Sequence, residues 1–424
     1  MTVSRLHVQQ NSPAGTGATR YQPHRMAVMS ALKRTSGVNS VMRKVSPDLN
    51  AAMIRAALLA CLVAAIATVP LPALAKSYIL YAGSYTTETS KGIYAWRFND
   101  EDGSLSSLGL AAEVTQPAHL WVAPNGRFLY AVNWEPEGGV SAFRVDSRSG
   151  KLTLLNKVSS QGALPNQVVL DPSGHIAIAV NYMSGTLAAY KVMDDGRLSE
   201  AFYVDKHTGT PLSPQQPYAK IHGVEFTKDS RYMYVTDLGL DRVYAYKVDI
   251  ANSTITPANL AYVNVHAGAG PRRLQLSPND RFLYVCHETD SKVSVFAVNG
   301  TEMKEIQMIS TLPPGATTKN TTAEIMIDRA GRHLYVSNRG HDSIAVFDID
   351  PASGRLKLVA NTLAGGRTPR NIRLDPSGRY LFSANEDGGT ITELKVDPQT
   401  GLLSTTSVSV SINHPGGLYF APSN

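Results

Sequence analysis

Cysteine is scarce in this sequence, because the 424 residues include only Cys61 and Cys286. Cys61 lies in an N-terminal apolar segment that we expect to be cleaved, so neither an intramolecular disulfide nor a metal-binding cysteine cluster is expected. The sequence also lacks a long amphipathic helical segment, a serine nucleophile elbow and an evident His/Asp metal triad. We therefore expect a protein that needs no metal and no cofactor.

An excess of charge of one sign is also missing once the N-terminal region is set aside. The whole chain has 40 basic and 34 acidic residues, a net charge of +6. Residues 1–75 contain eight of these basic residues and one of the acidic residues, which leaves 32 and 33 for residues 76–424. The net charge of −1 there includes no basic stripe, so no nucleic-acid partner is expected.

The N-terminal region has the features of a secretory signal peptide. Residues 56–75 carry no charge, follow Arg43, Lys44 and Arg55, and end in a small-x-small sequence. This pattern predicts a leader of residues 1–75, cleavage after Ala75, and a periplasmic or secreted bacterial protein with no membrane span after cleavage. An uncleaved membrane anchor is the alternative, because an apolar run of this length can span a bilayer.

A pattern of about 50 residues recurs through the rest of the chain. Each copy has an alternating strand, a four-residue turn signal, a second alternating strand that ends on a polar residue, and a third strand. A period near 50 residues with about four strands per unit is typical of a β-propeller. The clearest copies begin with residues 117–133, 165–181, 271–287 and 369–385.

The two ends of residues 76–424 together supply one further unit. Residues 415–424 match the first strand of the pattern, residues 78–85 match the second, and residues 91–99 match the third. A blade joined from both ends leaves no exposed sheet edge. We predict one all-β domain over residues 76–424, a seven-bladed β-propeller whose last blade is closed by N- and C-terminal strands.

Charged residues interrupt an otherwise uniform set of positions on one face of this propeller. Because the strands are antiparallel, the start of each first strand and the end of each second strand lie on the same face, near the central channel. Ala, Gly or Asn would suffice at these positions, and a purely structural repeat gains nothing from charge there. We interpret these charged residues, together with two asparagines at equivalent positions of the repeat, as a convergent binding site. The candidates are Asn166, His222, Arg272, Arg273, Glu288, Glu324, Arg339, Arg370, Asn385 and Glu386.

Structural roles are the alternative for several of these residues. Arg272 and Arg370 would then pair with Glu288 and Glu386, each sixteen residues further along the chain. His222 would be a hydrogen-bonded core histidine. The asparagines that end the second strands would cap the following loops through their side-chain amides.

Several motifs resemble the lactonase family of seven-bladed propellers, which includes propeller-type 6-phosphogluconolactonases and fungal carboxymuconate cyclases. The motifs are IHGVEF, GAGPRRLQLSPNDRFLYVCHETDSKVSVF and SNRGHDSIAVFDID, and the resemblance covers residues 78–421. It implies lactone chemistry and an active-site group. The matched residues are His222 in KIHGV, Arg272 in GAGPR, Glu288 in CHE and Arg339 in SNRG.

The sequence departs from the family pattern beside this group. Lys220 and Arg273 stand where the family often has histidine, and His287 stands where it often has asparagine. The four matched residues persist, so the resemblance still implies lactone chemistry. The changed neighbours leave specificity for a phosphorylated sugar open.

The candidate residues suit hydrolysis of a lactone, in which water attacks an ester carbonyl. Glu288 or His222 would accept the proton of the water, and Arg272 and Arg339 would hold the oxyanion or an anionic substituent. The expected partner is a small sugar lactone, 6-phosphogluconolactone or an unphosphorylated aldonolactone, and the expected state is a monomer or weak dimer. The alternatives are a non-catalytic binding propeller and a muconate-type cycloisomerase.

Overall fold

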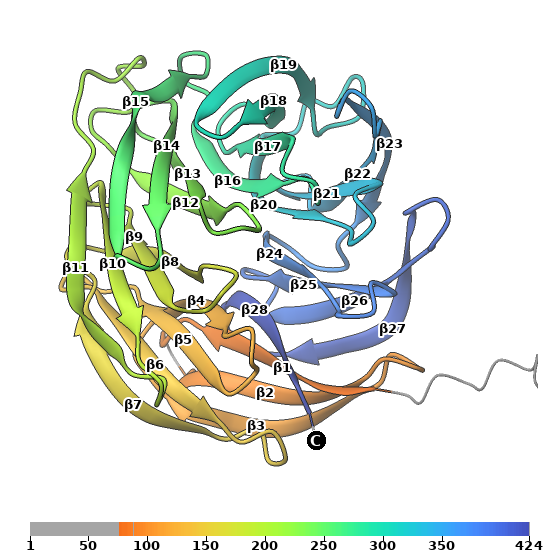
Figure 1. The fold of residues 1–424 in the computed structure, drawn as a ribbon. Helices are drawn as coiled ribbons and strands as arrows, with labels where there is room; N and C mark the ends of the chain where they lie inside the picture. Colours follow the sequence, from red (N-terminus) through yellow and green to blue (C-terminus); the bar gives the residue numbers. More distant parts are fainter. Residues whose placement is uncertain (1–75, 88, 424) are drawn as a thin grey trace, which may run out of the picture. The chain divides into compact units, whose positions relative to one another are not determined.

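The computed structural model describes residues 76–87 and 89–423. The predicted signal peptide, which ends at Ala75, lies outside these residues. The described residues form 28 β-strands in seven four-stranded antiparallel sheets, which are the blades of a propeller (Figure 1). The predicted seven-bladed fold is confirmed. Within the described part of the chain, no helix has the length and apolar character needed to cross a membrane.

The first two strands of every blade are mostly buried. Blade 1 consists of β28 and β1–β3, and blades 2–7 follow in chain order from β4–β7 to β24–β27. The first strands contact one another around the ring and are β28 (Pro415–Pro422), β4 (Pro117–Val122), β8 (Pro165–Leu170), β12 (Ile221–Phe226), β16 (Pro271–Leu276), β20 (Thr321–Ile327) and β24 (Pro369–Leu374). The second strands are β1 (Ser77–Ser84), β5 (Phe128–Asn133), β9 (Ile176–Asn181), β13 (Tyr232–Asp237), β17 (Phe282–His287), β21 (His333–Arg339) and β25 (Tyr380–Asn385).

The outer two strands complete each blade, and side chains of the fourth strands reach solvent at many positions. The third strands are β2 (Gly92–Asn99), β6 (Gly139–Val145), β10 (Thr186–Val192), β14 (Arg242–Asp249), β18 (Lys292–Asn299), β22 (Ser343–Ile349) and β26 (Thr390–Val396). The fourth strands are β3 (Leu105–Glu113), β7 (Leu152–Ser159), β11 (Leu198–Lys206), β15 (Thr254–Asn264), β19 (Glu302–Ser310), β23 (Leu356–Leu363) and β27 (Leu403–Ser411).

In several blades, a tyrosine of the second strand forms a hydrogen bond with the next blade. The Tyr130 hydroxyl donates to the Gly196 carbonyl at 2.9 Å, and the Tyr335 hydroxyl donates to the Gly401 carbonyl at 3.0 Å. Both glycines lie in turns between third and fourth strands, with φ of +90° and +67°, a region that favours glycine. Strand residues of one blade and turn residues of its neighbour therefore act together in docking the blades.

The ring closes where C-terminal β28 pairs with N-terminal β1, so that Tyr78 lies opposite Pro422. This pairing confirms the prediction that the two ends share one blade. Phe420 of β28 packs its ring 5.4 Å from that of Phe98 in the same blade and 5.4 Å from that of Phe382 in blade 7. A single buried ring thus contributes both to blade 1 and to its interface with blade 7.

We predict that Phe420→Ala lowers the free energy of unfolding by about 3–5 kcal/mol, because it leaves a cavity where blades 1 and 7 meet. Leu260→Ala is the matched control, since Leu260 is 81 % exposed and its loss should change stability by less than about 0.5 kcal/mol. Urea-induced unfolding followed by tryptophan fluorescence measures both. A loss below about 1 kcal/mol in Phe420→Ala would show that this contact does not stabilise the closed ring.

Candidate active site

A β-bulge near the start of the first strand brings the predicted site residues to the channel. In β16, Pro271 pairs with His287 and Arg273 pairs with Cys286, which leaves Arg272 as the extra residue. Bulges re-aim the side chain of the extra residue and are frequent beside active sites. The same register shift in β8, β12 and β24 gives Asn166, His222 and Arg370 the equivalent position.

Glu288 joins two arginines from neighbouring blades into one cluster. Its Oε2 atom lies 2.7 Å from Arg272 Nε and 3.0 Å from Arg339 Nη2. Arg339 Nη2 also donates to the Thr322 carbonyl at 3.1 Å, and Arg272 Nη1 donates to the Ala323 carbonyl. The carboxylate is 23 % exposed, whereas the Arg272 side chain is 3 % exposed, so the cluster reaches from the interior to solvent.

The charges in this cluster make Glu288 a weak proton acceptor. Burial acts to raise the pKa of Glu288, but Arg272 and Arg339 outweigh burial and hold that pKa below its usual value. Burial and the Arg272 charge lower the pKa of Arg339 to about 10, although Glu288 opposes them. Glu288 therefore stays ionised and holds two guanidinium groups in place.

His222 has the opposite character. Its side chain is buried, its Nδ1 atom has no hydrogen-bond partner, and the Tyr182 ring meets it edge-on with centroids 5.7 Å apart. Burial, followed by the charges of Arg272, Arg273 and Arg370, lowers the pKa of His222 well below 6.5. The imidazole is therefore neutral near pH 7 and retains a nitrogen that can accept a proton.

Arg273 links three first strands through hydrogen bonds to backbone carbonyls. Its Nη1 donates to the His222 carbonyl at 3.0 Å and its Nη2 donates to the Asn166 carbonyl at 3.0 Å. Its Nε lies 3.6 Å from Glu324 Oε2, an atom that also accepts a hydrogen bond of 2.7 Å from Asn371. These buried groups hold the backbone of His222 in position, and Asn371 is a member of this network that the sequence did not single out.

A second ion pair lies on the blade 7 side of the opening of the central channel, which we call the mouth. Arg370 Nη1 is 3.4 Å from Glu386 Oε2, and the Arg370 guanidinium lies over the Tyr85 ring at 5.4 Å. Both charged side chains are about one-fifth exposed. The structural alternative expected Arg272 and Arg370 each to pair with the glutamate sixteen residues later, and both pairs are present. Each pair nevertheless presents charge at the mouth.

Asn385 is not part of the mouth. It is fully buried, and its amide donates to Thr392 Oγ1 at 3.0 Å and to Thr390 Oγ1 at 3.2 Å, while its Oδ1 accepts from Ser383 Oγ at 2.9 Å. These bonds fix the loop after β25. Asn385 therefore has the loop-capping arrangement considered for the asparagines that end the second strands.

An aromatic wall stands beside His222. The Trp134 and Tyr182 rings lie 5.8 Å apart, and the Lys220 ammonium lies over the Tyr182 ring at 5.3 Å. Aromatic faces of this kind pack well against sugar rings. Cys286 is a buried thiol. Burial raises its pKa to about 11, so it is a poor nucleophile.

Comparisons with known proteins agree with this architecture. A family model described as lactonase, 7-bladed β-propeller, matches residues 79–420. The 6-phosphogluconolactonase of Bacillus subtilis is 34 % identical over 297 residues, which are 69 % of this chain and 84 % of that protein. The structure of the periplasmic gluconolactonase of Pseudomonas aeruginosa is 31 % identical, with a TM-score of 0.78, and the match covers 82 % of this chain and 100 % of that one.

The fold and the match together define the class: the chain belongs to the family of seven-bladed β-propeller lactonases. Among other relatives, the 6-phosphogluconolactonase of Formosa agariphila is 29 % identical over 300 residues, 69 % of this chain and 85 % of that protein. The resemblance inferred from the motifs is therefore confirmed at the level of the family.

We predict that the imidazole of His222 titrates well below pH 6.5, because burial and three arginines disfavour its protonated form. NMR of the protein with ¹³C-labelled histidine, recorded against pH, measures this pKa, and the His222→Gln variant assigns the signal. Removal of one charge in Arg370→Gln should raise the pKa. Titration of His222 at or above 6.5 would contradict the electrostatic description of the mouth.

Proposed function

We propose that this protein is a lactonase that hydrolyses a sugar lactone to the open-chain acid at this mouth of the propeller. One observation carries the proposal. The mouth combines an imidazole whose pKa is held well below 6.5, His222, with two guanidinium groups, Arg272 and Arg339, that Glu288 holds in place. Hydrolysis of a lactone needs a base that takes a proton from water and donors held ready for the oxyanion, and these residues supply both.

His222 acts as the base in this mechanism. It accepts a proton from the water that attacks the lactone carbonyl, and the carbonyl oxygen becomes an oxyanion. Arg339, with Arg272 behind it, stabilises that negative charge. The bond between the carbonyl carbon and the ring oxygen then breaks, the imidazolium returns its proton to the leaving oxygen, and a hydroxy acid results.

Glu288 is assigned a positioning role rather than that of the base. Both guanidinium groups of the cluster donate to the same carboxylate oxygen, which fixes the arginines before the substrate arrives. Preorganised charges stabilise a transition state without reorganisation during the reaction. Asn166, Arg273 and Glu324 support the strands beneath His222, and Arg370 and Glu386 border the substrate.

An unphosphorylated aldonolactone is the proposed substrate class. Arg370 pairs with Glu386, and Arg272 and Arg339 share Glu288, so these two groups leave a single uncompensated positive charge at the mouth rather than a cluster that would hold a phosphate. The predicted leader favours a location outside the cytoplasm, where phosphorylated sugar lactones are not formed. The similarity to a protein described as a periplasmic gluconolactonase supports the same choice.

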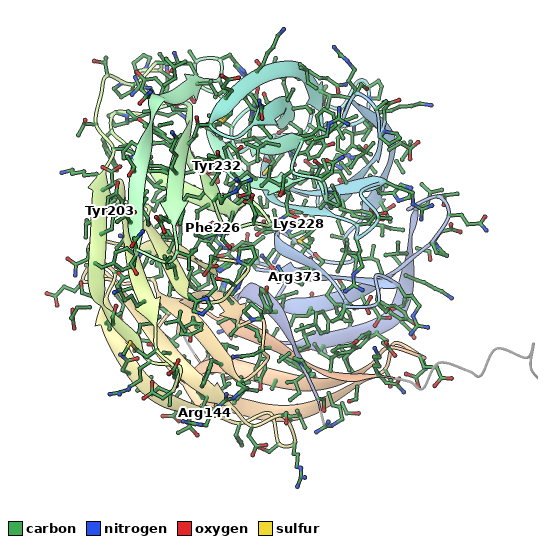
Figure 2. The ribbon with its side chains drawn as sticks, in the orientation of Figure 1. Arg144, Tyr203, Phe226, Lys228, Tyr232 and Arg373 are labelled. Carbon is green, nitrogen blue, oxygen red and sulfur yellow. The ribbon has the colours of Figure 1, made fainter. Side chains whose placement is uncertain are left out.

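We expect enzyme-dependent acid release from glucono-δ-lactone in a pH-stat, after subtraction of spontaneous opening. His222→Gln should lower kcat by about 10²–10⁴ because the general base is lost, and Arg339→Met should lower it by about 10²–10³ because an oxyanion donor is lost. Arg144→Ala is the control, since Arg144 is exposed on β6 at the outer side of a blade (Figure 2). Equal turnover in His222→Gln and wild type would remove His222 from the mechanism.

The substrate class is tested by comparing kcat/KM for glucono-δ-lactone and 6-phosphoglucono-δ-lactone. We expect the unphosphorylated lactone to be preferred in the wild type. Glu386→Gln frees the charge of Arg370 and should shift the preference toward the phosphorylated lactone. A wild-type preference for the phosphorylated lactone would overturn the assignment of substrate class, and no turnover of either would favour a non-catalytic binding propeller.

A further inference from the structure

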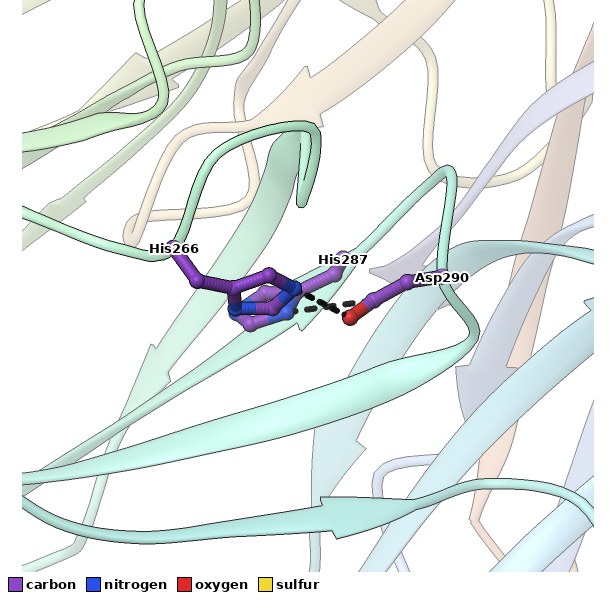
Figure 3. A group of neighbouring side chains, drawn as sticks. All are labelled: His266, His287 and Asp290. Carbon is purple, nitrogen blue, oxygen red and sulfur yellow. Dashed lines mark ion pairs between the residues drawn. The ribbon is translucent and has the colours of Figure 1, made fainter. Parts of the chain in front are cut away.

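Two imidazoles and a carboxylate converge on blade 5, outside the group assigned to lactone hydrolysis (Figure 3). His266 lies in the connection between β15 and β16, His287 is the last residue of β17, and Asp290 lies in the turn before β18. His266 Nε2 is 2.6 Å from Asp290 Oδ2, and His287 Nδ1 is 3.2 Å from Asp290 Oδ1. One ligating atom from each residue lies within 4.8 Å of the others.

The backbone that carries these side chains is fixed by its own hydrogen bonds. The buried carboxylate of Asp241 accepts from the amides of Gly268 at 2.7 Å and Gly270 at 2.8 Å, which holds the loop that contains His266. The amide of Thr289 donates to the Ala269 carbonyl at 3.2 Å, which ties that loop to the turn that contains Asp290. The three ligands are therefore held close together before any ion arrives.

His287 provides an independent observation that points to a ligand. Its side chain is completely buried, and neither ring nitrogen makes a hydrogen bond of normal geometry, although Nδ1 lies beside Asp290; the two carboxylate oxygens of Asp290 likewise make none. A buried imidazole nitrogen without a partner is costly. His266, by contrast, has a side chain that is 38 % exposed, which leaves a path from solvent to the group.

The geometry suits a small divalent cation. Ligand atoms about 2.0–2.1 Å from a tetrahedral Zn²⁺ lie roughly 3.3 Å apart, so separations between 2.6 and 4.8 Å require only small side-chain movements. The Lys292 ammonium, 3.3 Å from Asp290 Oδ2, competes for the same carboxylate. Its side chain is 37 % exposed and can turn into solvent when a cation binds.

We propose that His266, His287 and Asp290 bind a divalent first-row cation, with Zn²⁺ the best match, and leave a fourth position to water. A ligand set of two imidazoles and one carboxylate is typical of Zn²⁺ sites with an open position. The bound ion would cross-link the β15–β16 connection to the turn after β17. This site is additional to the proposed lactonase site and does not depend on it.

Isothermal titration of the untagged, metal-free full-length chain with ZnCl₂ tests the proposal, and Co²⁺ reports the geometry through its visible absorption bands. We expect one Zn²⁺ per chain. His266→Ala and Asp290→Asn should weaken binding by more than about 100-fold, because loss of outer partners alone already costs about 10–100-fold. His175→Ala is the matched control, because His175 is exposed and precedes β9. The Zn²⁺ affinity of this variant should equal that of the wild type.

Thermal unfolding of the metal-free variants shows whether each substitution leaves the fold intact. Because the readout is metal affinity, failure of the lactonase assay does not affect this test. Absence of Zn²⁺ binding by the wild type overturns the proposal. Binding that is unchanged in a folded His266→Ala variant also overturns it, because the ion would then occupy surface histidines elsewhere.

Discussion

The pairing of β28 with β1 is the constraint on which the rest of the molecule depends. A sheet ring is stable only when no blade is left without its neighbour, and here the last neighbour is assembled from the two ends of the described chain. The candidate active site draws on five blades, from Asn166 in blade 3 to Arg370 in blade 7. Its distances therefore exist only when the ring is closed.

The bulge at the start of the first strands converts this closed ring into a site. In blades 2–5 and in blade 7 it frees one residue of the first strand from regular pairing, so a charged side chain there does not disturb the sheet. Charge buried in this way needs partners, and the structure supplies them in two groups. Arg273 with Glu324 forms one group, and Glu288 with its two arginines forms the other, whose carboxylate reaches solvent.

The division of labour between His222 and Glu288 follows from their partners. Both were candidate bases in the sequence, and in the structure they differ in their partners. In the structure, Glu288 shares its oxygen between two guanidinium groups, whereas His222 Nδ1 has no partner and its pKa is lowered by burial and by arginines. A neutral imidazole suits proton acceptance, and a doubly paired carboxylate suits positioning.

The features that sequence reasoning missed lie between the repeat columns or depend on contacts between blades. Asn371 joins the group of Arg273 and Glu324 through a bond to Glu324, 47 residues earlier in the chain. His266 belongs to a loop that the repeat does not describe, and its approach to Asp290 depends on the loop amides that donate to the Asp241 carboxylate. Asn385 was a candidate because of its position in the repeat, but its side chain caps a loop.

The sequence by itself determined the seven-bladed ring, its closure by both ends and the set of charged residues at one mouth. It could do so because strand periodicity and a 50-residue repeat are local properties, and antiparallel pairing then fixes which positions share a face. Only the tertiary structure decided that Arg339 shares Glu288 with Arg272 and that Arg273 pairs with Glu324. Those outcomes depend on distances of a few ångströms between blades and on burial, and no local pattern in the chain encodes them.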